Sequence, residues 1–510
     1  MIRLIELFSG IGAQAKALKN LGLEFEHYKT CDWEVNATKS YHAIHSNDNK
    51  DYSEFFTKEE LVDKLFKLGI SSDGKKPMTF DSIKRKGELW LRQTYNAIKA
   101  TNNLVDITKV HAKDLGIVDT DKYDYLLTYS FPCTDLSLAG KMAGMEKGSG
   151  TSSSMLWEVE RILKECDNLP QYLLMENVPQ VHSSKNAKAF EKWLDILDDL
   201  GYVSRWFDLN SKHYGVPQNR NRTFVVSIRK DIDDGSFDFP KPFKLELKLK
   251  DLLDQEVDEK YYLSKKQLAY VLDAKDVALK SGRNINNRIV NPEIAKTISC
   301  RGAADQRADV TNFVINGCDE EVTVQNLKDK IKEFGEEKII CEQRYDEGLR
   351  FFKDNICGSL RTIDSCGDKR VIEIPKDDSL WIDVQAQMIT EDGDVKRYIN
   401  SDVVDKFEEG QCADISFPNG YNKSNRVHDE CPAINLTTTK NSFVYKENQI
   451  PLRIRKLTPK ECWRLMGFDD EDFDKASKVN SDSSLYKQAG NSIVVNVLML
   501  IFKQLFGGKC

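Results

Sequence analysis

The sequence predicts an α/β fold: a doubly wound, Rossmann-like domain joined to a second domain of mostly β and irregular structure. Three observations predict it. Residues 1 to about 229 alternate short apolar strands with helical patterns, which is typical of a doubly wound sheet. The chain then becomes polar and rich in turn residues to about 450, and from Leu452 the α/β character returns. We therefore divide the chain into residues 1–231, 232–450 and 451–510.

The first region supplies strands and helices in regular order. Apolar runs predict strands at Ile2–Phe8, Phe25–Asp32, Asp124–Ser130, Tyr172–Glu176 and Thr223–Ile228. Helical patterns cover Gly12–Leu21, Leu156–Cys166 and Ala187–Leu200. Ligands of such sheets bind at the carboxyl ends of the strands, so the residues that follow each strand are the candidates for function.

The middle and last regions have a different character. Phe237–Pro242 is typical of a linker, and three similar segments near 295–315, 360–372 and 435–445 predict repeated hairpins, although turn-rich strands can resemble one another by chance. In the last region, an N-cap Thr458 with Pro459 and Glu461 behind it predicts a helix start. An apolar helix over 492–506 is expected to close the fold.

Composition excludes several classes of protein. Hydrophobic residues make up 40% of the chain, which favours a packed core over disorder. The 12 cysteines form no CxxC pair, which argues against a metal site or a disulfide framework. No stretch approaches about 18 apolar residues and no signal peptide is evident, so we expect a cytoplasmic protein without a membrane span. The net charge of -7 argues mildly against nucleic-acid binding, although a basic cleft can lie in an acidic protein.

A cofactor site is predicted at the first strand ends. Phe8–Gly12 joins a strand to a helix, and its two glycines let a ligand approach the backbone. Asp32-Trp33 closes the second strand, where an acid can hold ribose hydroxyls and an indole can cover a base. Asp106-Ile107 could pair with an adenine edge and pack on its face. These features fit adenosine, whereas the missing third glycine of the dinucleotide fingerprint disfavours a nicotinamide dehydrogenase.

A reactive group is predicted at the next strand ends. Cys133 follows the strand Asp124–Ser130 through a proline, and Glu176 ends the following apolar strand. A lone cysteine is usually a buried structural residue, but a carboxyl group ending a hydrophobic strand is costly without a task or a partner. Arg222 precedes another strand. A nucleophile, a proton donor and a fixed cation are therefore expected at neighbouring strand ends.

These segments resemble the ordered motifs of the DNA (cytosine-5)-methyltransferases. The motifs are Phe8-Ser9-Gly10-Ile11-Gly12, Phe131-Pro132-Cys133, Glu176-Asn177-Val178, Gln218-Asn219-Arg220-Asn221-Arg222 and Gly490-Asn491-Ser492. Their order and spacing match, including the long variable region before the last motif, and the likeness covers roughly the first 230 and last 60 residues. Each motif alone is modest, but five in order are specific.

The resemblance implies a function and a set of roles. It implies transfer of a methyl group from S-adenosylmethionine to C5 of a cytosine flipped out of double-stranded DNA. Cys133 would attack the base, Glu176 would face its N3, Arg222 its O2, and Arg220 would support the loop and the phosphate side. The S-adenosylmethionine pocket would be lined by Phe8, Gly10, Ile11, Gly12, Asp32, Trp33, Asp106, Ile107, Pro132, Asn491, and Met155 or Leu156.

The resemblance also implies a DNA-reading region over 232–450. Residues expected at the DNA are Ser137, Gln218, Arg301, Arg307, Arg370 and Lys440, each of which could equally be an ordinary polar residue. Thr134 stands where the family usually has Gln, and Ser152-Ser153 where a positive residue is common, which leaves the details of loop closure open. Transfer-RNA-methylating relatives share the catalytic motifs, but their recognition region is usually small. We expect a monomer, and the sequence leaves a cognate restriction endonuclease open as a partner.

Overall fold

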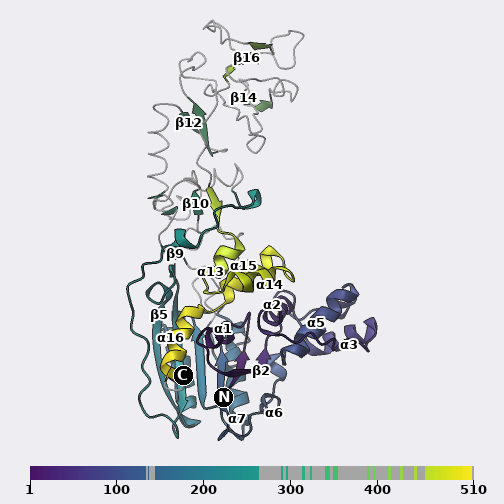
Figure 1. Cartoon of the computed structure of the whole chain (residues 1–510), viewed down its shortest axis with the longest axis vertical. Coiled ribbons are helices and arrows are strands. Elements are labelled where there is room, and N and C mark those ends of the chain that lie inside the picture. The colour runs from purple at the N-terminus through teal and green to yellow at the C-terminus, as the bar shows by residue number, and fades with distance from the viewer. Residues whose placement is uncertain are drawn as a thin grey trace. The chain divides into compact units, whose positions relative to one another are not determined.

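A computed structural model describes the chain over residues 1–133, 136, 144–262, 294–296 and 454–507, with short strands between 289 and 444. The chain divides into two compact units (Figure 1). The first comprises Met1–Val257, Glu293–Asn312 and Leu457–Cys510, and the second comprises Asp258–Pro292 and Phe313–Lys456. The first unit therefore combines the beginning and the end of the chain.

A six-stranded sheet forms the centre of the first unit, with strand order β2-β1-β3-β4-β7-β5. The strands are β1 (Ile2–Leu7), β2 (Phe25–Cys31), β3 (Asp124–Tyr129), β4 (Tyr172–Asn177), β5 (Tyr202–Asn210) and β7 (Asn221–Arg229). Strands β2, β1, β3 and β4 are parallel, whereas β7 is antiparallel to both β4 and β5. The five predicted strands are confirmed within two residues at each end, whereas β5 was not predicted.

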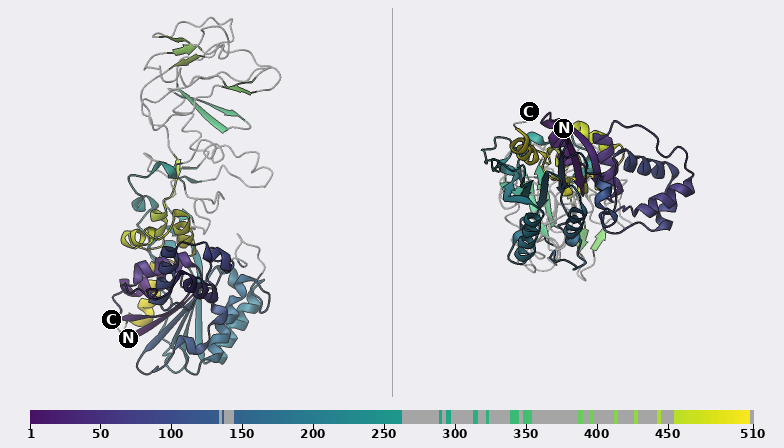
Figure 2. Two further views of the ribbon diagram at one scale, coloured as in Figure 1. Left: turned by 90° about the vertical axis from the view of Figure 1, so that its right-hand side faces the viewer. Right: turned by 90° about the horizontal axis from the view of Figure 1, so that it is seen from below.

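Helices cover both faces of this sheet, as a doubly wound fold requires (Figure 2). The helices that flank it are α1 (Ala13–Asn20), α2 (Val35–His45), α6 (Ala112–Leu115), α7 (Leu156–Glu165), α8 (Ala187–Asp199) and α16 (Val495–Phe506). Tyr172 of β4 contacts Phe506 of α16 on one face. The predicted fold class is confirmed, with a mixed rather than an all-parallel sheet.

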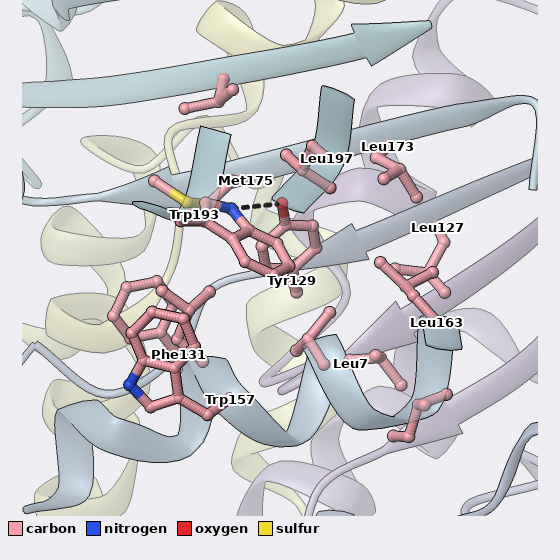
Figure 3. Packing of buried hydrophobic residues seen from close by; sticks show 14 of the residues in the cluster. Leu7, Leu127, Tyr129, Phe131, Trp157, Leu163, Leu173, Met175, Trp193 and Leu197 are labelled. Atoms are coloured by element: carbon pink, nitrogen blue, oxygen red, sulfur yellow. Dashed lines mark hydrogen bonds between the residues drawn. The ribbon is translucent and has the colours of Figure 1, made fainter. Parts of the chain in front are cut away.

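The other face of the sheet packs against α7 and α8 and forms the main core (Figure 3). Alternate strand residues such as Leu7, Leu127 and Met175 point into this core, as the two-residue period of a strand dictates. Trp193 of α8 is fully buried there and its indole Nε1 donates a 3.2 Å hydrogen bond to the Tyr129 hydroxyl. This packing fixes the strands whose carboxyl ends carry the candidate site.

A helical lobe that the sequence did not reveal is inserted between β2 and β3. It contains α3 (Lys58–Leu68), α4 (Phe80–Lys84) and α5 (Glu88–Ala100), which pack with α2 around their own small core. Helix α3 begins in a capping box, in which the Thr57 hydroxyl accepts from Glu60 N and the Glu60 carboxylate accepts from Thr57 N. The apolar residues of this lobe, among them Leu61, Leu65 and Leu91, are spaced for helices, but no element was predicted between residues 32 and 124.

The end of the chain returns to the first unit through α13 (Pro459–Arg464), α14 (Asp470–Ser477), α15 (Asp482–Asn491) and α16. The predicted start of α13 is confirmed, because Thr458 and Glu461 form a capping box with Pro459 in the first turn. Lys16 of α1 bonds Asp469 and Asp472, at the start of α14, so the two ends of the chain are joined by buried charge. The closing helix was predicted to begin at Ser492 and begins at Val495.

The expectation that no stretch of the chain approaches a membrane-spanning length needs correction. The segment Asp482–Phe506 is long and apolar enough to span a membrane by length and composition, with a mean hydropathy of 1.5 over its most apolar window. The structure breaks it into α15 and α16, because Ser492 at the end of α15 is extended. Of that window 56% is buried, and Leu498, Ile501 and Phe502 are core residues. This is the pattern of a core helix.

In the second unit, the described residues are short strands. A four-stranded sheet has the order β11-β8-β10-β19, and a three-stranded sheet has the order β17-β16-β18. Strands β12 and β13 form one two-stranded ladder, and β14 and β15 form another. Their bounds are β8 (Ile289–Val290), β10 (Phe313–Ile315), β11 (Val322–Thr323), β12 (Ile339–Arg344), β13 (Gly348–Lys353), β14 (Gln387–Ile389), β15 (Val395–Arg397), β16 (Cys412–Asp414), β17 (Arg426–His428), β18 (Ser442–Val444) and β19 (Ile454–Lys456). The predicted mostly β character fits these strands, and most of the three similar segments lies outside the described residues.

Candidate active site

The candidate site lies where the carboxyl ends of β3 and β4 meet the amino end of β7. Parallel strands β3 and β4 bring their last residues to one edge of the sheet. Because β7 runs antiparallel to β4, its first residues reach that same edge, with Thr223 beside Asn177 and Phe224 beside Glu176. The strand directions therefore explain how Arg222, near the start of β7, meets Glu176, near the end of β4.

Glu176 is held by groups from both neighbouring strands. Its Oε1 lies 3.2 Å from Arg222 Nε, and the Ser130 hydroxyl donates a 2.6 Å hydrogen bond to its Oε2. Arg222 is itself fixed, because its Nη1 donates to the Asn221 carbonyl at 2.7 Å. The side chain of Glu176 is 7% exposed and that of Arg222 is 16% exposed, so the pair opens to the outside mainly through the guanidinium.

The turn that carries Cys133 is held at two successive carbonyls. Asn177 Nδ2 donates to the Phe131 carbonyl at 2.9 Å, and the Ser153 hydroxyl donates to the Pro132 carbonyl at 2.7 Å. Cys133 is partly buried and its own carbonyl accepts from Leu136 N. The sulfur is thus presented by a backbone that neighbouring elements fix, as a positioned nucleophile requires.

The loop Phe8–Gly12 turns sharply between β1 and α1. Phe8, Gly10 and Gly12 all have positive φ, at 61°, 55° and 78°. A side chain added at Gly12 would collide with His45 and Tyr41, whereas one added at Gly10 would meet nothing within 4 Å. The loop is therefore packed tightly at one glycine and open at the other, where a ligand can approach the backbone.

Asp32 lies next to this loop at the end of β2. Its Oδ2 accepts from Gly10 N at 2.9 Å and its Oδ1 accepts from Glu34 N at 2.8 Å. Burial, with the neighbouring Glu34 carboxylate, raises the pKa of Asp32 to about 6. Asn103 fixes the Asp32 backbone by bonds to both its N–H and its carbonyl. An acid beside an open glycine is the arrangement that an adenosine ribose needs, so these residues fit S-adenosylmethionine.

The other predicted cofactor residues are held by packing or by local hydrogen bonds. Trp33 packs against the core of the helical lobe, and Ile107 and Met155 pack against the main core. Asp106 caps a short 3-10 helix, η1 (Ile107–Lys109), through Thr108, and pairs with Lys109 at 3.1 Å. Ile11 is buried within the glycine loop.

Two predicted residues have buried partners within the protein, and for Gln218 this requires a correction. Gln218 was expected to contact DNA, but it is fully buried and its Nε2 donates to the Leu465 carbonyl at 2.7 Å. Arg220 is also buried, and its Nη2 donates to the carbonyls of Gly490 and Ser492 at 3.0 and 2.7 Å. These bonds hold the turn on either side of Asn491.

The remaining DNA-facing predictions cannot be placed. Ser137, Arg301, Arg307, Arg370 and Lys440 lie outside the described residues, as does Thr134. Among the residues that the structure does describe, no cluster of three or more His, Cys, Asp or Glu side chains could hold a metal ion.

Sequence reasoning missed several residues that shape the site. Ser130, Asn103 and His45 each fix a predicted site residue or its backbone, the last by a 2.9 Å bond between its Nε2 and the Ile11 carbonyl. Ser153, noted from the sequence only as a departure from the family pattern, fixes the Pro132 carbonyl. Ser130 carried a usable signal: it occupies the position before Phe131-Pro132-Cys133, which parallel pairing places beside Glu176. His45 and Asn103 gave no signal, since their contacts depend on tertiary packing.

Comparisons with known proteins agree with this geometry. The family model for C-5 cytosine-specific DNA methylases matches residues 64–507. The type II methyltransferase M2.ScrFI of Lactococcus lactis subsp. cremoris is 30% identical over 99% of both chains. The orphan methyltransferase M.SssI of Spiroplasma monobiae is 38% identical over 52% of this chain and 67% of its own length. A solved methyltransferase structure, EhMeth of Entamoeba histolytica, is 12% identical with a TM-score of 0.50 over 100% of this chain and 99% of that one, which supports the fold alone.

The fold and the site define an S-adenosylmethionine-dependent methyltransferase. The chain belongs to the family of C-5 cytosine-specific DNA methylases, and its reaction is the transfer of a methyl group to C5 of cytosine in DNA. Methylation of DNA is thereby favoured over the alternative of transfer-RNA methylation.

Proposed function

We propose that this enzyme methylates a flipped-out cytosine within a specific double-stranded DNA sequence through a covalent bond between Cys133 and C6 of the base. The observation that supports this most strongly is the meeting of Glu176 and Arg222, 3.2 Å apart, at the sheet edge where the Cys133 turn also ends. A base placed against this edge would have a nucleophile, an acid and a cation within one site. The base must leave the stack to reach it.

The chemistry follows from these three groups. The Cys133 thiolate attacks C6, and the electrons of the C5–C6 double bond move through C4 onto N3. Glu176 gives its proton to N3, and Arg222 stabilises the negative charge at O2. C5, now enamine-like, would take the methyl group that S-adenosylmethionine supplies, as the bond from that methyl to the sulfonium sulfur breaks and leaves a neutral thioether. A base then removes the C5 proton, the C5–C6 double bond reforms as the Cys133 sulfur leaves, and N3 returns its proton to Glu176.

We assign the cofactor to the residues that follow β1 and β2, at the same end of the sheet as the catalytic groups. Gly10 would bring the backbone to the ligand, Asp32 would hold the ribose hydroxyls, and Trp33 would cover the adenine. Arg220, by bonding the carbonyls of Gly490 and Ser492, would keep Asn491 at the pocket. S-adenosylmethionine supplies an electrophilic methyl group, and the chain's task is to hold C5 of the base in line with it.

We assign target recognition to residues 232–450, where Arg301, Arg307, Arg370 and Lys440 would contact DNA and Ser137 would contact it from the loop after Cys133. The enzyme would act as a cytoplasmic monomer. The proposal that a cognate restriction endonuclease accompanies this chain is supported by its likeness to M2.ScrFI, a type II methyltransferase. Its likeness to M.SssI, an orphan methyltransferase, opposes that proposal.

Covalent capture tests the proposed mechanism. DNA that carries 5-fluorocytosine at the target, incubated with methyl donor, retains its C5 substituent because fluorine cannot leave as a proton does. The enzyme should become irreversibly linked to this DNA, and mass spectrometry should locate the link on Cys133. The buried Cys462 offers a matched control, because Cys462→Ser should still be captured. Capture that survives Cys133→Ala would contradict the mechanism.

A further inference from the structure

The register of the central sheet places Ser130 beside the catalytic carboxyl group. Strands β3 and β4 pair in parallel, with Thr128 opposite Leu174 and Tyr129 opposite Met175. One step further along both strands sets Ser130 beside Glu176, and parallel neighbours project their side chains to the same face. The 2.6 Å bond from the Ser130 hydroxyl to Glu176 Oε2 is the result.

The two oxygens of Glu176 have different partners. Oε2 receives the Ser130 hydroxyl, which comes from the strand that also leads into Cys133. Oε1 faces Arg222 Nε at 3.2 Å. A carboxyl group held at only one oxygen can rotate about its last bond, whereas donors on opposite sides fix its plane. The plane of this carboxyl group is therefore defined before a base arrives.

We infer that Ser130 is a positioning residue for Glu176, an inference that rests on the proposed function. The Ser130 hydroxyl donates to Oε2 and so leaves Oε1 as the oxygen that carries the transferable proton. When the base enters, the Ser130 bond keeps Oε1 directed at N3, while Arg222 stabilises the pyrimidine O2. Ser130 touches no atom of the base and acts through Glu176.

The arrangement also couples the acid to the nucleophile. Ser130 precedes Phe131 and Pro132, whose carbonyls are held by Asn177 and Ser153. Asn177 directly follows Glu176 in β4. Ser130, which follows β3, thus bonds Glu176, and Asn177, which ends β4, bonds the turn that carries Cys133. These two contacts together set the spacing between the acid and the nucleophile.

Steady-state kinetics of DNA methylation test the inference with Ser130→Ala, Ser130→Thr and Glu176→Gln. Loss of one hydrogen bond to a catalytic carboxyl group should lower kcat of Ser130→Ala by roughly ten- to a hundredfold. The KM for S-adenosylmethionine should stay within about twofold of wild type, since the Ser130 hydroxyl bonds Glu176 and not a predicted cofactor residue. Ser130→Thr keeps a hydroxyl and should recover most of the lost rate.

A double-mutant cycle separates positioning from general structure. If Ser130 acts through Glu176, adding Ser130→Ala to Glu176→Gln should cause little further loss. Ser227, a buried serine of β7 whose hydroxyl bonds Ser204, provides the matched control, and Ser227→Ala should keep the wild-type kcat. A Ser130→Ala enzyme with wild-type kcat, or equal losses in both backgrounds, would overturn the inference. A fully active Glu176→Gln enzyme would instead show that the proposed function of Glu176 is wrong.

Discussion

The buried ion pairs between α1 and α14 predict a large and specific loss of stability. The Lys16 side chain is 4% exposed and bonds Asp469 and Asp472, the latter at 2.8 Å and only 5% exposed. Burial disfavours the Lys16 ammonium, but its bonds to the two carboxylates outweigh burial and raise its pKa. Lys16→Met leaves the Asp472 charge buried without this partner, which costs about 3–5 kcal/mol in comparable cases. We expect the free energy of unfolding to fall by about 3 kcal/mol, because Asp469 N still donates to Asp472.

Urea unfolding followed by tryptophan fluorescence measures this change, since Trp193 and Trp463 are buried in the same unit. Lys475, which pairs with Glu471 at the surface, offers a matched control, and Lys475→Met should leave the midpoint unchanged. Adding Asp472→Asn to Lys16→Met removes the buried charge and should restore part of the loss. A fall of less than about 1 kcal/mol for Lys16→Met would refute the reasoning.

Three further predictions concern the cofactor loop and its support. Gly12→Ala should weaken binding of S-adenosylmethionine at least about tenfold, as measured by calorimetry, because the added Cβ would collide with His45. Gly22 also has a positive φ but has open space around it, so Gly22→Ala should bind normally. Burial raises the pKa of Glu6 to about 8, so the folded state keeps a proton that the unfolded state loses. The free energy of unfolding should therefore fall as the pH rises from about 4.5 to about 8. Glu6→Gln should abolish this pH dependence in denaturant titrations. Arg220→Gln should raise the KM for S-adenosylmethionine more than it lowers kcat; an unchanged KM would show that Arg220 does not position Asn491.

The sequence predicted the elements that end at the site because those elements are regular. Apolar runs such as Asp124–Tyr129 are buried on both faces, so they stand out from their surroundings. Capping residues such as Thr458 and Glu461 act locally and were also recognisable. The direction of a strand could not be recognised, since nothing in the run Asn221–Arg229 distinguishes an antiparallel strand from a parallel one.

Residues whose role depends on distant contacts were harder to predict. Gln218 is a polar residue within a motif that resembles a DNA-contacting one, yet it bonds Leu465, which is far along the chain. His45 supports the glycine loop from α2. Such roles follow from how segments pack, which a single sequence does not reveal, whereas Ser130 could be placed once the pairing of β3 with β4 was known.

The measurement that tests the account most directly is transfer of radiolabelled methyl groups from S-adenosylmethionine to unmethylated double-stranded DNA, with Cys133→Ala alongside and transfer RNA as a second substrate. Bisulfite sequencing of the DNA would locate the modified bases. We predict label at cytosines of a defined sequence with the wild type, none with Cys133→Ala, and none on transfer RNA. Label that persists with folded Cys133→Ala, or that falls on transfer RNA and not on DNA, would contradict the account.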